Sequence, residues 1–134
     1  MSRLKDVPGL PDVVLIRTES HDTDSYYWDN RSRGGSTDVV IQQTLSGSVF
    51  LETAAGRRWV EAGHAMLFSQ AEESRYGLDA RCARPYRCRW AQFSGGGAFR
   101  TLFEEVRAAY GPVVRLAVDG EAGRMMARME EDLE

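Results

Sequence analysis

Between residues 13 and 93 the chain consists of short strand-like runs, separated by turn residues and with no helical pattern between them. The runs are Val13–Arg17, Tyr26–Arg31, Val39–Leu45, Ser48–Thr53, Arg57–Glu61, His64–Phe68, Arg75–Leu78 and Tyr86–Phe93. Glycine-containing segments, Arg33–Ser36, Ala54–Gly56 and Glu61–Gly63, supply turns between several of them. Many short strands at regular spacing are typical of a sandwich or barrel, so the pattern predicts a mainly β fold, a barrel of about eight strands.

The pattern changes at Gly95–Gly97, beyond which apolar residues recur at helical spacing. The first stripe is Phe99, Leu102, Phe103, Val106 and Tyr110, and the second is Ala122, Met125, Met126, Met129 and Leu133. Gly111 and Pro112 end the first run. The sequence thus predicts two C-terminal α-helices that pack their apolar stripes on an outer face of the β fold.

These patterns divide the chain into three segments. Residues 1–12 carry two prolines and a glycine with little periodicity, so an extended N-terminal arm is expected there. Residues 13–93 form the β domain, and residues 94–134 form the helical segment. Because the sequence stops at Glu134 within a helical pattern, we expect it to be a fragment of a longer protein.

Charge and hydropathy argue against two classes of function for this segment. Its 17 Lys and Arg residues are outnumbered by 20 Asp and Glu residues, for a formal net charge of -3 at pH 7. Since phosphate neutralisation supplies most of the affinity for nucleic acid, the segment is not expected to bind DNA by itself. It has no apolar run of membrane-spanning length and no signal peptide, so a cytoplasmic location is expected. In that reducing compartment Cys82 and Cys88 are expected to be free thiols.

The sequence offers little for metal binding or covalent catalysis. A metal site in a small barrel needs several imidazole or carboxylate groups that converge from neighbouring strands. Only His21 and His64 are present, far apart in sequence, and His64 follows a turn glycine where it is expected to face solvent. There is no Gly-x-Ser-x-Gly motif, and neither cysteine has a histidine near it in sequence. No metal, no cofactor and no catalytic residue is therefore expected.

The remaining candidate functional residues are aromatic and cationic side chains, which suit a polar, ring-shaped ligand. An indole covers the C–H face of a sugar, while a phenol or a guanidinium donates hydrogen bonds to its hydroxyl groups. The candidate ligand-binding residues are Trp28, Arg31, Arg33, Tyr76 and Trp90. The alternative is that the tryptophans fill the core, with Tyr26 and Tyr27 on the exterior of the barrel.

Five short motifs give the chain a resemblance to a known family. They are Tyr26-Tyr27-Trp28-Asp29-Asn30-Arg31-Ser32-Arg33, Thr44-Leu45-Ser46-Gly47, Ala62-Gly63-His64-Ala65-Met66-Leu67-Phe68, Arg75-Tyr76 and Arg89-Trp90-Ala91-Gln92-Phe93. In this order and spacing they resemble the N-terminal cupin-like domain of AraC-type bacterial transcription regulators. The resemblance covers residues from about 26 to 93, and the helical tail also fits it.

The resemblance implies a jelly-roll barrel that binds a small effector, often a sugar. In the family, helices join this barrel to a pair of helix-turn-helix motifs that contact DNA, and the whole protein is a homodimer. By the same resemblance Tyr76 and Trp90 fall where the arabinose-responsive member contacts its sugar, and Arg33 falls one residue out of register from such a position. The resemblance also implies an arm that closes over the pocket, as it does in that relative. Cys88 replaces a histidine that helps to hold that sugar, which argues against arabinose itself. The fragment alone is expected to be monomeric or weakly dimeric.

Two other functions compete with an effector-binding domain. One is a stand-alone, metal-free barrel enzyme such as a sugar isomerase or epimerase, for which His21 and Tyr76 are the only acid–base pair the sequence offers. The other is a dimerisation module whose barrel is filled by its own side chains. Ligand-induced stabilisation separates the sensing domain from the dimerisation module.

Overall fold

The computed structural model describes residues 12–133, so the predicted arm lies outside the described residues except for Asp12. The strands are β1 (Asp12–His21), β2 (Tyr27–Asp29), β3 (Val39–Ser46), β4 (Ser48–Thr53), β5 (Gly56–Glu61), β6 (His64–Ser69), β7 (Arg75–Gly77), β8 (Tyr86–Ser94) and β9 (Val113–Arg115). The helices are α1 (Gly97–Tyr110), α2 (Glu121–Leu133) and a 3-10 turn, η1 (Asn30–Ser32). The prediction of a mainly β fold with two C-terminal helices is confirmed.

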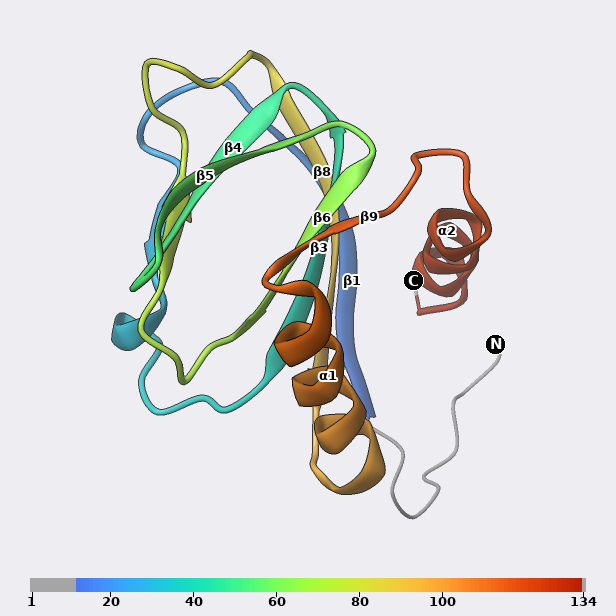
Figure 1. Cartoon of the computed structure of the whole chain (residues 1–134). Helices are drawn as coiled ribbons and strands as arrows, with labels where there is room; N and C mark the ends of the chain where they lie inside the picture. Colours follow the sequence, from blue (N-terminus) through green and yellow to red (C-terminus); the bar gives the residue numbers. More distant parts are fainter. Residues whose placement is uncertain (1–11, 134) are drawn as a thin grey trace.

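Two antiparallel sheets face each other across an apolar core (Figure 1). The larger sheet has the strand order β1-β8-β3-β6-β9, and the smaller has the order β2-β7-β4-β5. The core between them draws on both sheets, with Val40, Met66, Phe68, Tyr86 and Cys88 from the larger and Val49, Leu51, Val60 and Tyr76 from the smaller.

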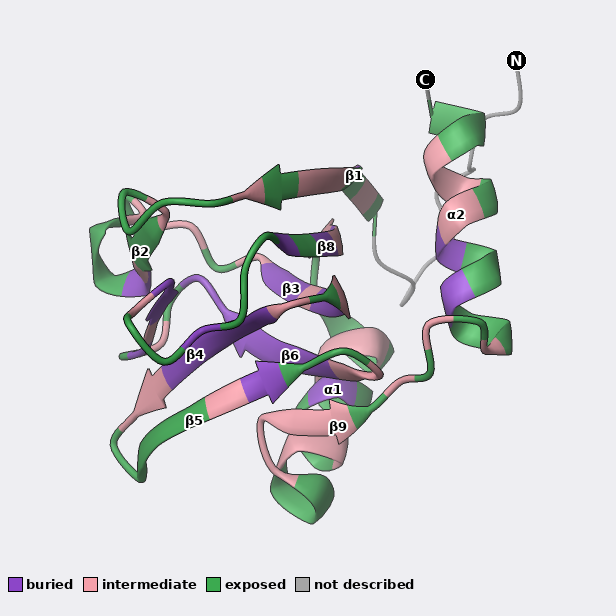
Figure 2. Cartoon of the chain, turned by 90° about the horizontal axis from the view of Figure 1, so that it is seen from above, coloured by how far each residue is buried: buried purple, intermediate pink, exposed green. Residues whose placement is uncertain are grey.

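The larger sheet is covered on both faces, because the helices pack on the side opposite the core (Figures 1 and 2). Phe103 of α1 packs on Val39 and Leu67, and Met126 of α2 packs on Ile16 and Ala91. Double coverage explains why successive residues of β3 and β6 are buried, including Gln42, Gln43 and Thr44 of β3. In the described part of the chain, no helix has the length and apolar character needed to cross a membrane.

The helices bury less of their apolar stripes than the sequence pattern predicts. In α1 Leu102 is 57% exposed and Tyr110 is 73% exposed, while in α2 Met125 is 57% exposed. Each helix lies on the flat outer face of a sheet, so only the residues along one narrow line reach it. Phe103 and Met126 are the side chains that become buried.

A glycine fixes the tight turn from β3 in one sheet to β4 in the other. Gly47 has a φ of 71°, a left-handed conformation that side-chain-bearing residues rarely adopt. A Cβ atom there would lie 2.4 Å from the carbonyl oxygen of Pro85 and 2.5 Å from that of Ala83. The chain can therefore cross between the sheets beside the start of β8 only with glycine at this position.

Both cysteines are free and buried in the core, which predicts low reactivity in the native state. Burial raises the pKa of the Cys88 thiol to about 12, and burial also raises the pKa of Cys82. Because the thiolate is the reactive form, both residues should resist a thiol reagent at neutral pH. We expect labelling of native protein to be slow and labelling in urea to be rapid. Rapid reaction of either native thiol would contradict the packing described here.

Candidate functional site

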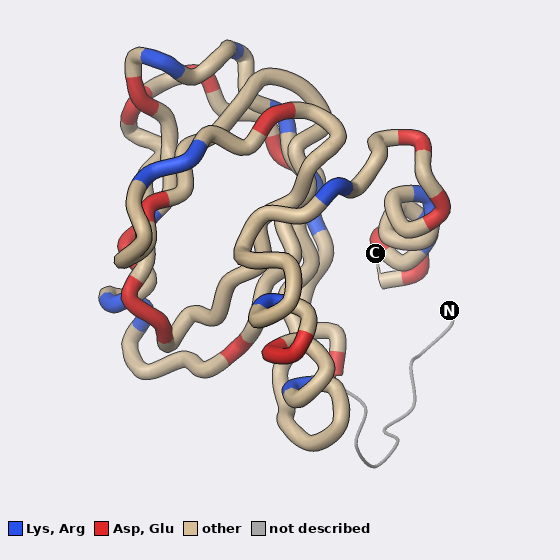
Figure 3. The backbone as a smooth tube through the Cα atoms, viewed as in Figure 1, with Lys and Arg blue, Asp and Glu red and all other residues tan. Residues whose placement is uncertain are grey.

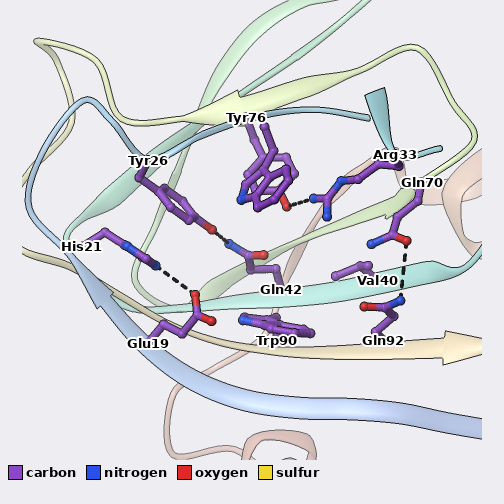
Figure 4. A pocket seen from close by; sticks show the side chains of 11 residues that line it. Glu19, His21, Tyr26, Arg33, Val40, Gln42, Gln70, Tyr76, Trp90 and Gln92 are labelled. Carbon is purple, nitrogen blue, oxygen red and sulfur yellow. Dashed lines mark hydrogen bonds and ion pairs between the residues drawn. The ribbon is translucent and has the colours of Figure 1, made fainter. Parts of the chain in front are cut away.

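A cavity of about 340 Å³ opens between the two sheets (Figure 4). It is lined by Glu19, His21, Tyr26, Trp28, Arg33, Val40, Gln42, Gln70, Tyr76, Trp90 and Gln92. The lining comes from β1, β3 and β8 of the larger sheet, from β2 and β7 of the smaller sheet, and from the connecting loops. Aromatic rings and polar groups predominate in it, a composition typical of a site for a small polar ligand.

On the side of the smaller sheet, an arginine lies against two aromatic rings. The guanidinium of Arg33 is 4.0 Å from the centroid of the Trp28 ring, and it donates a hydrogen bond to the hydroxyl of Tyr76. Tyr76 is in turn packed against Phe68, with ring centroids 4.8 Å apart. Burial raises the pKa of Tyr76 to about 12, against the opposing effect of the nearby Arg33 charge. Tyr76 therefore presents a protonated phenol at neutral pH.

A buried glutamine holds two phenols at the back of the cavity. Gln42 points inward from β3 and is 2% exposed. Its side-chain amide donates to the hydroxyls of Tyr26 and Tyr86, each at 2.9 Å. Burial raises the pKa of both phenols, so they remain protonated well above neutral pH. The resulting network fixes the Tyr26 ring against the cavity.

On the side of the larger sheet, the cavity carries a carboxylate and an indole. Glu19 and His21 extend from the same face of β1, and Glu19 Oε1 is 2.9 Å from His21 Nε2. The imidazole also stacks on Tyr26, with ring centroids 3.8 Å apart. Trp90 is half-buried on β8, two residues along the strand from Gln92. Gln92 donates to Asp38 at 2.7 Å, which orients its amide at the opposite end of the cavity from His21 (Figure 4).

The structure brings four of the five sequence-predicted residues to this one cavity: Trp28, Arg33, Tyr76 and Trp90. It does not bring Arg31 there. Arg31 is exposed and pairs with Glu73, with 3.3 Å between Nη1 and Oε1. The physical reason is the 3-10 turn η1, whose three residues per turn direct positions two apart along the chain to different sides.

Sequence reasoning missed most of the polar lining. Glu19, Gln42 and Gln92 were not among the candidates, although Gln42 and Gln92 each stand beside an apolar or aromatic residue of their strand. An inward amide in such a strand is the signal that could have found Gln42 and Gln92. The alternative that places both tyrosines on the exterior is wrong for Tyr26, because its ring lines the cavity, whereas Tyr27 is exposed.

The two histidines lie in different surroundings. His21 lines the cavity, whereas His64 is half-buried at the start of β6, and its Nδ1 atom is buried without a hydrogen-bond partner. The expectation of a solvent-facing His64 is therefore wrong. Among residues 12–133, no group of three or more His, Cys, Asp or Glu side chains is placed to hold a metal ion.

Comparison with known proteins gives no independent guide to function. A scan against protein-family models finds no match, and a search of curated proteins finds no relative. The function is therefore inferred from the cavity and from its connection to the rest of the fold.

Proposed function

We propose that the chain is the effector-sensing domain of an AraC-type bacterial transcription regulator, with a cupin-like jelly-roll barrel that binds a small polar molecule such as a monosaccharide. In this proposal DNA is contacted only by a separate helix-turn-helix domain, and the whole cytoplasmic protein is a homodimer. The two facing sheets and the helices on one outer face are compatible with that architecture.

The observation that carries the proposal is that three neighbouring strands connect the cavity to the α2 region. Each of β1, β3 and β8 carries a residue that lines the cavity. Its immediate neighbour in the chain contacts α2 or the segment just before α2. The cavity residues are Glu19, Gln42 and Trp90, and the adjacent helix anchors are Thr18, Gln43 and Arg89. Successive residues of a strand face opposite sides of a sheet, so each pair spans its thickness.

The helix anchors make specific polar contacts. Thr18 donates to Glu130 of α2 through its backbone nitrogen and its hydroxyl, both at 2.8 Å, and Arg89 pairs with the same carboxylate at 3.4 Å. Gln43 donates to the carbonyl oxygens of Leu116 and Ala117, just before α2. A ligand that shifts these strands would alter how α2 is held, and such differential contact is what a sensing domain requires.

The size and lining of the cavity support a small polar ligand over a filled core. Its volume of about 340 Å³ lies near the lower end of the roughly 300–1,000 Å³ of small-molecule sites. The Trp28 and Trp90 indoles can cover the apolar faces of a ring, while Gln42, Gln92 and Tyr76 can bond to its polar edge. This arrangement weighs against the side-chain-filled dimerisation module.

A melting-temperature screen tests the proposal. At about a hundredfold excess over Kd, a ligand stabilises the folded state by roughly 2.7 kcal/mol, which gives a measurable shift. We expect a monosaccharide or a related polar compound to produce that shift and Trp90→Ala to abolish it. Trp59→Ala is the matched control, because Trp59 is half-buried outside the cavity, with its indole nitrogen donating to Asp79. A Trp90→Ala protein that binds as well as the parent would remove Trp90 from the site.

A second candidate, a sugar isomerase or epimerase, is favoured by one observation: His21 and Tyr76 line the same cavity. Tyr76 would act as an acid and His21 as a base. His21 is already engaged by Glu19 and Tyr26, which favours the sensing domain. Conversion of a bound sugar, followed by NMR and lost in His21→Asn, would establish the enzyme instead.

A further inference from the structure

Arg33 differs from the other arginines in how its charge is balanced. Charged residues of both signs are spread along the chain (Figure 3), and seven arginines pair with a carboxylate. Of the eight described arginines that lack such a partner, seven are exposed to solvent, and Arg33 is the eighth. Within residues 12–133, Arg33 is therefore the one partly buried arginine without a counter-ion.

The surroundings of Arg33 leave part of its hydrogen-bonding edge unused. One guanidinium face is covered by Trp28, and one terminal nitrogen donates to Tyr76. The Nε atom is buried and has no hydrogen-bond partner in the described part of the chain. A withdrawn cation without a counter-ion costs free energy unless another group balances its charge. Cation–π attraction offsets only part of that cost.

The opposite side of the cavity has the complementary character. Figure 4 shows Arg33 and Glu19 on opposite sides, with Gln42 between them. Glu19 accepts hydrogen bonds, so it suits hydroxyl or ammonium donors on a ligand. A dianionic phosphate would meet the Glu19 carboxylate in the same small cavity, and Arg33 is the only arginine among the described residues that line it, which favours a single negative charge.

Building on the proposed function, we propose that the effector is a small carboxylic acid with hydroxyl groups, such as a sugar acid. Its carboxylate binds the edge of the Arg33 guanidinium, whose face Trp28 covers and whose Nη2 atom donates to the Tyr76 hydroxyl. Its hydroxyl groups reach Gln42 and Glu19. The ligand thereby supplies the counter-ion that the protein itself does not.

Matched pairs of compounds test this inference. Each pair is a neutral sugar or polyol and its carboxylate, for example glucose with glucuronate and galactose with galacturonate, at millimolar concentration and constant ionic strength. Binding is followed by melting temperature and by tryptophan fluorescence, since Trp28 and Trp90 both line the cavity. We expect at least one carboxylate to bind and its neutral partner to bind about 10- to 100-fold more weakly, the loss of a charge-assisted hydrogen bond.

Variants at two nearby arginines separate the outcomes. Arg33→Gln should remove the preference for the carboxylate, whereas Arg33→Lys should restore it in part. Arg31→Gln is the matched control, because Arg31 is exposed and pairs with Glu73 outside the cavity. Neutral sugars that bind as tightly as their acids, a preference for sugar phosphates, or carboxylate binding that persists in Arg33→Gln would overturn the inference and leave the sensing function standing. If no compound binds, both proposals fail.

Discussion

Above pH 10 the free energy of unfolding should fall by at least about 4 kcal/mol for each pH unit, because the three most deeply buried acids, in addition to Tyr26 and Cys82, keep their protons in the folded state. The three are the phenols of Tyr76 and Tyr86 and the thiol of Cys88, which are 4%, 0% and 0% exposed. Burial raises the pKa of Tyr76 and of Cys88 to about 12, and it raises the pKa of Tyr86 strongly.

The direction follows from where each proton is lost. In the unfolded chain the thiol ionises near pH 8.5 and the phenols near pH 10, whereas in the folded chain they keep their protons to higher pH. Their contribution to stability is fully present below those values and declines as the pH rises toward about 12. Since domains of this kind are stable by about 5–15 kcal/mol, a domain at the low end of that range is expected to unfold between one and two pH units above pH 10.

Urea titrations at several alkaline pH values measure this slope. Tyr76→Phe removes one ionising group and should reduce the slope by about 1.4 kcal/mol per pH unit. Val49→Ala is the control, because it creates a cavity in the core without changing a titrating group. It should lower stability equally at every pH. A stability that stays flat up to pH 12 would contradict the burial of these acids.

The sequence predicted the strands well where one face meets the apolar core and turn residues mark the ends. The sequence pattern underestimated the length of β1, which was predicted to end at Arg17 and continues to His21. The reason is physical: the last part of β1 lines a polar cavity with Glu19 and His21, so the apolar alternation that marks a half-buried strand is lost there. The β2 strand is shorter than predicted because the chain enters the 3-10 turn at Asn30.

The candidate site was predictable only for side chains whose chemistry stands out. Trp28, Arg33, Tyr76 and Trp90 were found because aromatic and guanidinium groups are natural ligand contacts. Glu19, Gln42 and Gln92 were missed because an inward polar residue and a surface polar residue look alike in sequence. Only the pairing of β1, β8 and β3 shows that these three share one face of the larger sheet.

Loss of the Glu130 carboxylate should release α2 from the larger sheet and remove the connection between cavity and helix. Glu130 and Arg89 are each less than 20% exposed at the side chain, so Glu130→Ala leaves a half-buried guanidinium without its partner. It also removes both hydrogen bonds from Thr18. We expect the free energy that protects α2 amides from hydrogen exchange to fall by about 2 to 3 kcal/mol.

The same variant distinguishes a sensing domain from a simple binding module. If the strands couple the two sites, a ligand should change hydrogen exchange in α2 of the parent protein, and this change should be lost in Glu130→Ala while the ligand still binds. The exposed Glu131 of the same helix supplies the control, because Glu131→Ala makes the same change of charge without touching Thr18 or Arg89. If a ligand changes hydrogen exchange in α2 equally in Glu130→Ala and Glu131→Ala, then Glu130 does not connect the cavity to the helix. If a ligand binds the parent protein without changing hydrogen exchange in α2, the chain lacks the coupling between cavity and helix that a regulator needs.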